Sequence, residues 1–218
     1  MTTLNLCALG SLIEVNIIGL DEGQTHQVEQ SWRWCIATGD AALHAPATRL
    51  SFSVGETSWS GDSRNYRDFE TFASDLAGVV TRTAIDAADS KWMLVHAAAI
   101  AHPQTGEVIA FIGASGAGKS TLAKALATDY AYVTDETLAV DLATGEVLAY
   151  PKPISLFSDG PGSPKRQVGP AQLEFEQAAH QLRLRQVFLL DRQTEPTGMP
   201  QTKTITTLRA VEELVPQV

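Results

Sequence analysis

Eight consecutive residues of the chain have the types and the order that bind phosphate groups. They are Gly113, Ala114, Ser115, Gly116, Ala117, Gly118, Lys119 and Ser120, and they match every fixed position of the pattern G-x-x-x-x-G-K-[ST]. Glycines allow the backbone to turn so that successive N–H groups meet phosphate oxygens. A lysine ammonium reaches the β- and γ-phosphates, and a serine hydroxyl can bind Mg²⁺. We therefore expect Gly113 to Thr121 to hold a nucleoside triphosphate and its metal ion.

The segments on both sides of this loop are those that a phosphate loop requires. Residues 108–112 form an apolar run of buried-strand length, and residues 121–127 place Leu122, Ala125 and Leu126 on one face of a helix. The N-terminus of a helix carries a partial positive charge that favours an anion. The order strand, glycine loop, helix argues against the alternative of a glycine-rich turn that binds nothing.

Two carboxylates follow the next apolar run. Residues 131–133 read as a short strand, and Asp135 and Glu136 come directly after it. Carboxylates at the carboxyl edge of a neighbouring strand face the same crevice as the glycine loop. There they can bind Mg²⁺ or accept the proton of an attacking hydroxyl. The alternative is a solvated acidic pair at a strand end.

A histidine interrupts the apolar strand expected at residues 93–101. A lone histidine such as His96 in this setting is more often a hydrogen-bonded core residue than a catalytic one. Both interpretations stay open on this residue alone.

Taken in order, these features resemble the catalytic domain of bacterial HPr kinase/phosphorylase and its smaller relatives. The order is His96-Ala-Ala-Ala-Ile, a short turn, an apolar strand, the glycine loop, a helix and the acidic pair, and the resemblance extends over residues 92–156. It ends in the run Tyr150-Pro-Lys-Pro-Ile-Ser-Leu. It implies a P-loop core of α/β class with a mixed sheet and β-hairpins.

The resemblance also implies a role for each matching residue. Asp135 would be the catalytic base that takes the proton of an acceptor hydroxyl, and His96 would interact with it. Lys119 would neutralise phosphate charge, and Ser120, Asp135 and Glu136 would form the Mg²⁺ site, with Glu136 where the family usually has a second aspartate. The implied reaction is ATP-dependent transfer of the γ-phosphate to a hydroxyl of a protein or peptide serine, or of a small molecule.

Two features of that family are not found in the chain. A downstream signature segment is absent, and the first ninety residues do not resemble the regulatory domain, so neither HPr as the acceptor nor reversal of the reaction is implied. Two other classes of function stay open. One is a small-molecule kinase of the shikimate or gluconate type, which also has an aspartate after the strand that follows the P-loop helix. The other is a nucleotide-binding regulatory protein with little turnover.

Composition limits the classes of molecule that the protein is expected to bind. The 218 residues have a formal net charge of -9, which argues against a nucleic-acid footprint because phosphate backbones are bound by clustered Lys and Arg. No apolar run has the length of a membrane span, so we expect no membrane partner. Cys7 and Cys35 are expected to be reduced, structural thiols of a cytoplasmic protein. Whether the chain forms a homo-oligomer is left open.

Periodicity and turn residues predict the remaining organisation. We expect a small, mainly β N-terminal region at residues 1–65 and a P-loop core with a leading helix at residues 66–218. The expected strands are 12–18, 32–37, 50–54, 93–101, 108–112, 131–133, 138–140, 147–150 and 187–190, and the expected helices are 66–88, 121–127, 173–184 and 208–215. Residues 151–170 read as a loop, in which Lys165 or Arg166 could approach a phosphate; the alternative is an exposed basic loop.

Overall fold

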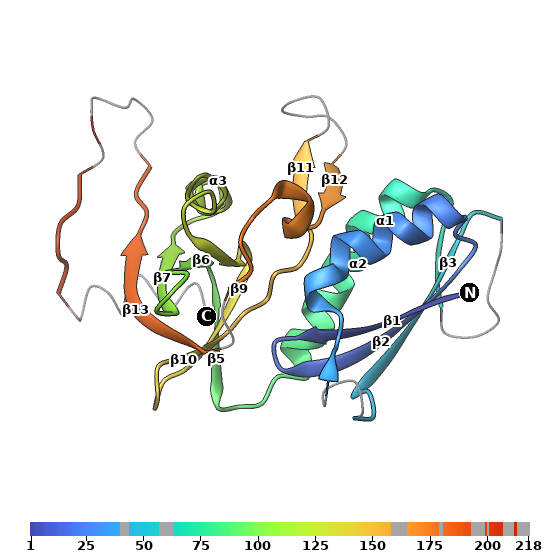
Figure 1. The fold of residues 1–218 in the computed structure, drawn as a ribbon, viewed down its shortest axis with the longest axis horizontal. Helices are drawn as coiled ribbons and strands as arrows, with labels where there is room; N and C mark the ends of the chain where they lie inside the picture. Colours follow the sequence, from blue (N-terminus) through green and yellow to red (C-terminus); the bar gives the residue numbers. More distant parts are fainter. Residues whose placement is uncertain are drawn as a thin grey trace. The chain divides into compact units, whose positions relative to one another are not determined.

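A computed structural model describes residues 1–39, 44–56, 63–157, 165–178, 181–192, 199, 201–206 and 212. The chain divides into two compact α/β units, which are shown in Figure 1. The first unit contains Met1–Ser90 and Tyr150–Gln177, and the second contains Lys91–Ala149 and Ala178–Val218. Each unit has its own sheet.

The first unit is built on a four-stranded sheet in the order β1-β2-β3-β4. Its strands are β1 Thr2–Ala8, β2 Ser11–Ile18, β3 Thr48–Val54 and β4 Arg64–Tyr66. β1 and β2 form an antiparallel hairpin, whereas β3 runs parallel to β2 and to β4. Leu4, Leu6 and Ala8 are buried and alternate with exposed polar residues, as a sheet with one covered face requires. The strands predicted at 12–18 and 50–54 are confirmed.

Helices α1, Glu22–Trp32, and α2, Phe69–Asp86, of this unit contact its four-stranded sheet (Figure 1). Helix α1 begins at a capping box formed by Asp21 and Gln24. Helix α2 is capped by Asp68 and contacts all four strands, and it confirms the helix predicted at 66–88. The strand predicted at 32–37 is wrong. The cap at Asp21 starts a helix that runs to Trp32, and a 3₁₀ turn, Arg33–Cys35, follows it.

The chain returns to the first unit after the core of the second. Strands β11, Ile154–Phe157, and β12, Lys165–Val168, form an antiparallel hairpin, and a 3₁₀ turn, Pro170–Leu173, contacts α1. The predictions of a loop at 151–170 and of a helix at 173–184 are therefore wrong. The basic residues expected in a loop lie on β12, where Arg166 is exposed, and residues 158–164 lie outside the described part of the chain.

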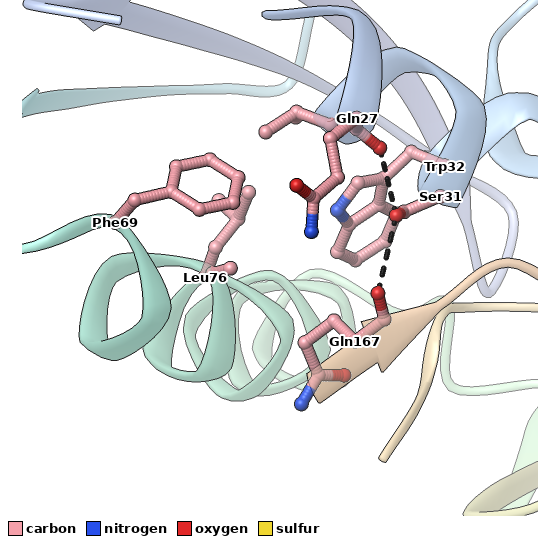
Figure 2. A pocket seen from close by; sticks show the side chains of 8 residues that line it. Gln27, Ser31, Trp32, Phe69, Leu76 and Gln167 are labelled. Atoms are coloured by element: carbon pink, nitrogen blue, oxygen red, sulfur yellow. Dashed lines mark hydrogen bonds between the residues drawn. The ribbon is translucent and has the colours of Figure 1, made fainter. Parts of the chain in front are cut away.

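A small cavity lies within the first unit, among α1, α2 and β12 (Figure 2). The side chain of Gln27 points into it between Phe69 and Trp32, and the Ser31 hydroxyl donates to the carbonyls of Gln27 at 2.8 Å and of Gln167 at 3.4 Å. Its volume of about 10 Å³ accommodates one water molecule at most. A nucleotide therefore cannot bind there.

The second unit is built on a seven-stranded mixed sheet in the order β5-β9-β10-β13-β7-β6-β8. Its strands are β5 Trp92–His96, β6 Ala98–Ala101, β7 Glu107–Ile112, β8 Ala131–Thr134, β9 Thr137–Asp141, β10 Glu146–Leu148 and β13 Leu182–Leu189. Its helix is α3, Lys119–Leu126. β13 and β7 are parallel, and every other neighbouring pair is antiparallel. The expectation of a mixed sheet with β-hairpins is confirmed.

Each strand at an end of that order, β5 or β8, is continuous in the chain with a strand near the opposite end. β5 continues into β6 with one residue between them, and β8 continues into β9 with two, so two long segments pair with each other along their length. The sheet thereby curves back on itself. The strand predicted at 93–101 is present but is interrupted at Ala97.

Both faces of β6 are buried, because the curved sheet encloses one core and α3 covers another. Ala97, Ala99 and Ala101 belong to the enclosed core, with apolar residues of β7, β8 and β9. Ala98 and Ile100 belong to the core beneath α3, with Phe111 and Ala123. This alternation identifies which face of the sheet lies on the side of α3.

The division of the chain differs from the boundary expected after residue 65. Because α2 packs its apolar face on the first sheet, residues 66–90 belong with the N-terminal strands. The helix predicted at 208–215 lies outside the described residues except for residue 212.

Candidate nucleotide site

The glycine loop connects β7 directly to α3. Gly118 has φ +98°, a left-handed conformation, and an added Cβ there would meet no atom within 4 Å. Helix α3 starts at Lys119, two residues before the predicted start, and the Leu122 N–H donates to the carbonyl of Gly118. The first N–H groups of α3 and the open space at Gly118 are what a phosphate group requires to approach the backbone closely.

Lys119 is held inside this loop. Lys119 is 6% exposed, and its Nζ donates to the carbonyl of Gly113 at 2.6 Å and to that of Ala114 at 3.3 Å. Burial lowers the pKa of the ammonium below its ordinary value. The ammonium thus contacts two carbonyl oxygens in the first half of the loop. Phosphate oxygens can take their place as its hydrogen-bond acceptors.

Ser120 and Asp135 are joined by a hydrogen bond. The hydroxyl of Ser120 donates to the backbone carbonyl of Asp135 at 3.2 Å, which brings the start of α3 against the turn between β8 and β9. Asp135 and Glu136 are both half-buried, and Oδ1 of Asp135 is shielded from solvent. The structure therefore brings the backbone of Asp135 against Ser120, at the start of α3.

A β-bulge sets the direction of Asp135. β6 and β8 pair Ala101 with Ala131 and Ile100 with Tyr132, but Ala99 pairs with Thr134, so Val133 is an extra residue on β8. Without it, Asp135 would follow Val133 onto the enclosed face. With it, the register beyond Ala99 places Asp135 opposite Ala98, on the face that α3 covers.

His96 lies on that same face. It is the last residue of β5, two positions before Ala98, and it pairs with Thr137; the Ala97 N–H donates to the carbonyl of Glu136 at 3.0 Å. His96 and Asp135 are therefore diagonal neighbours across the ribbon, a relationship that separates Cα positions by about 7–8 Å. The side chain of His96 is exposed, which disfavours the core-histidine alternative.

The residues present are suited to a nucleotide-bound Mg²⁺ ion. Such ions are held by one or two protein oxygen ligands together with phosphates and waters, and Ser120 with Asp135 provides that kind of set. Within the described ranges, no group of three or more His, Cys, Asp or Glu side chains could hold a metal without a nucleotide. Glu136 follows Asp135 in the same turn, and its part in metal binding stays a prediction.

One residue near the loop was not selected by sequence reasoning. Arg192, three residues after β13, donates from Nη1 to the carbonyl of Gly116 at 3.4 Å. It is 76 positions from Gly116 in the sequence, and only the parallel pairing of β13 with β7 brings the two together. A local motif contains no signal for it.

Comparison with known proteins supports the nucleotide site. A family model described as ABC transporter matches residues 102–194, less than half of the chain. The matched stretch contains β7, the glycine loop, α3 and β13. A search of curated proteins found no match. Together with the loop geometry, the family match indicates an ATP-binding P-loop nucleotide-binding domain.

No helix in the described part of the chain combines the length and apolar character needed to cross a membrane.

Proposed function

We propose that this protein is an ATP-dependent phosphotransferase that moves the γ-phosphate of ATP to a hydroxyl group. The observation that supports this most directly is the position of Asp135. Its backbone is bonded to Ser120 of the phosphate loop, and the β-bulge puts it on the face that also contains His96. These positions support a carboxylate and an imidazole on one face of the sheet, with the carboxylate residue bonded through its backbone to the phosphate loop.

The residues divide the work of the reaction between them. The carboxylate of Asp135 accepts the proton of the acceptor hydroxyl while the hydroxyl oxygen attacks the γ-phosphorus. The bond between that phosphorus and the bridging β–γ oxygen breaks, and ADP leaves. Lys119 and the N–H groups of the loop stabilise the negative charge that develops on the phosphate oxygens. His96 orients the acceptor or the Asp135 carboxylate.

A bound Mg²⁺ ion would supply further charge neutralisation, and Ser120 and Asp135 are the residues that would hold it, with Glu136 as the further ligand that the resemblance implies. Acceptors of three kinds suit this chemistry: a protein serine, a peptide serine or a small alcohol. The free thiols of Cys7 and Cys35 support a cytoplasmic site of action.

ATP hydrolysis is a second candidate function, and the match to the ABC transporter family model favours it. In that reaction water takes the place of the acceptor hydroxyl, and the same Asp135 would orient it. The two functions differ in the fate of the phosphate and not in the nucleotide site.

The test follows that phosphate. The full chain is incubated with γ-labelled ATP, Mg²⁺ and either extract of the source cells or serine-containing peptides. Label on an acceptor that disappears in Asp135→Asn and persists in Asp129→Asn supports phosphotransfer, because Asp129 is an exposed carboxylate just before β8. Label released only as inorganic phosphate, again dependent on Asp135, supports hydrolysis. Binding of ATP without any Asp135-dependent release or transfer overturns both.

A further inference from the structure

The segment after β13 is fixed to the start of the phosphate loop by its backbone. β13 runs parallel to β7 in a register that pairs Leu189 with Ile112, and the Leu190 N–H donates to the carbonyl of Ile112 at 2.8 Å. An added Cβ on Gly113, whose φ is +154°, would lie 2.8 Å from the carbonyl oxygen of Leu190. The close approach at Gly113 therefore holds residues 190–192 beside the loop.

Arg192 extends from this fixed segment to the loop itself. Its guanidinium donates to the carbonyl of Gly116 over 3.4 Å, and the side chain is exposed. A hydrogen bond of this length in solvent contributes little to stability. A guanidinium has five N–H donors arranged to match phosphate oxygens, and a single peptide carbonyl uses few of them. Arg192 can therefore leave Gly116 for a phosphate at small cost.

The positions of the two cations indicate which phosphates Arg192 would meet. Lysines in this motif reach the β- and γ-phosphates, and Nζ of Lys119 lies at Gly113 and Ala114. The segment that carries Arg192 is fixed beside Gly113 at Leu190, next to that ammonium, so the arginine side chain, which now reaches Gly116, starts from the β/γ side of the loop. The α-phosphate, in contrast, lies toward the N–H groups at the start of α3.

We propose that Arg192 is a phosphate-binding residue that contacts the γ-phosphate of ATP, exchanging its hydrogen bond to Gly116 for one to a phosphate oxygen. This inference rests on the proposed ATP-dependent function of the same site and names a second cation for it. In a protein of net charge -9, with Asp135 bonded through its backbone to Ser120, a second cation offsets repulsion of the nucleotide. It would act in phosphotransfer and in hydrolysis alike.

Calorimetric titration tests the proposal without any acceptor. The wild type, Arg192→Met, Arg192→Lys and the control Arg185→Met are titrated with Mg²⁺–ADP and with Mg²⁺ and the non-hydrolysable β,γ-imido analogue of ATP. Arg185 is an exposed arginine of β13 that pairs with Glu107, so its replacement removes an equal charge seven residues earlier in the chain. Arg192→Met should weaken binding of the analogue at least about tenfold and binding of ADP far less, as expected for the loss of one charge-assisted hydrogen bond. Arg192→Lys should keep part of the difference, and Arg185→Met should change neither.

Equal weakening of both nucleotides by Arg192→Met, or no change in either, overturns the assignment. Thermal unfolding of the variants separates a structural effect, because an exposed side chain with one long hydrogen bond should leave the midpoint unchanged. If the analogue-specific loss is found but the labelling experiment shows no transfer, the role of Arg192 stands and the phosphotransferase proposal falls. If transfer is found without the analogue-specific loss, the reverse holds.

Discussion

The hydroxyl of Ser120 donates a hydrogen bond to the backbone carbonyl of Asp135 over 3.2 Å. This bond connects the first turn of α3 to the turn between β8 and β9, and it uses the main chain of Asp135, so the carboxylate keeps its own partners. On the proposed assignment, a metal ion bound by the Ser120 hydroxyl would also act on the position of Asp135, the proposed base, through this hydrogen bond.

Replacement of Ser120 should separate these effects. Ser120→Ala removes the hydroxyl, so we expect Mg²⁺ to lose most of its strengthening effect on ATP binding, whereas Ser120→Thr should keep it. The lost hydrogen bond to Asp135 should lower the free energy of unfolding by about 1 kcal/mol. Calorimetric titration with ATP, in Mg²⁺ and in EDTA, measures the first effect. An Ala variant whose affinity for ATP responds to Mg²⁺ as the wild type does would contradict the metal assignment.

The buried ammonium of Lys119 should link nucleotide binding to pH. Burial lowers its pKa below the ordinary value of 10.5, so its charge costs folding free energy at neutral pH, and stability should rise as pH increases from the lowered pKa to 10.5. Phosphate oxygens beside Nζ should raise the pKa again, so ATP binding should take up protons within that alkaline interval. Binding heats measured in two buffers with different protonation enthalpies report the uptake.

The matched variants for this linkage are Lys119→Met and Lys124→Met. Lys124 lies on the same helix, α3, five residues after Lys119. Lys119→Met should bind ATP weakly and show no proton uptake, whereas Lys124→Met should behave as the wild type. Proton uptake that persists in Lys119→Met would assign the linkage to another group.

His96 should affect turnover and not stability. The side chain is exposed at the end of β5, so His96→Asn should leave the thermal midpoint within about 1 °C of the wild type, as for most surface substitutions. If His96 orients the acceptor or Asp135, phosphate transfer should fall about tenfold or more with little change in ATP affinity. His26→Asn, at an exposed position of α1, is the control. Unchanged turnover in His96→Asn would leave Asp135 without that partner.

The sequence was a good guide where the signal is local. The strand, glycine loop and helix expected to bind the phosphates are consecutive in the sequence. The structure contains β7, this loop and α3 in that order, with α3 beginning at Lys119. The acidic pair was found because it follows a short apolar run. Each of these features depends on neighbours along the chain, which periodicity and motif can detect.

The direction of Asp135 could not be predicted in this way. It depends on one extra residue, Val133, and a bulge exists only relative to the strand that β8 pairs with. The contact of Arg192 with Gly116 is equally non-local, because it requires β13 to lie beside β7. Residues 173–184 show helical spacing of apolar side chains, yet the sheet takes Leu182 into β13, where tertiary pairing overrides the local pattern.

Two turns of the second unit have the sequence Thr-Gly-Glu, one between β6 and β7 and one between β9 and β10, and they offer a matched test of how β13 packs. Gly106 and Gly145 both have a left-handed backbone, with φ +70° and +75°, so alanine at either position should cost about 1–2 kcal/mol of conformational strain. At Gly106 an added Cβ would also lie 2.1 Å from the carbonyl oxygen of Gln181, next to the start of β13, whereas at Gly145 the nearest atom is a flexible Arg183 side chain at 3.5 Å.

Gly106→Ala should therefore lower the free energy of unfolding by at least about 2 kcal/mol more than Gly145→Ala, because the clash with main chain must displace β13. Denaturant unfolding of both variants measures the difference. Since β13 carries the segment that ends in Arg192, Gly106→Ala should also weaken binding of the β,γ-imido analogue of ATP, and Gly145→Ala should not. Equal stability losses in the two variants would show that β13 does not press on the turn at Gly106.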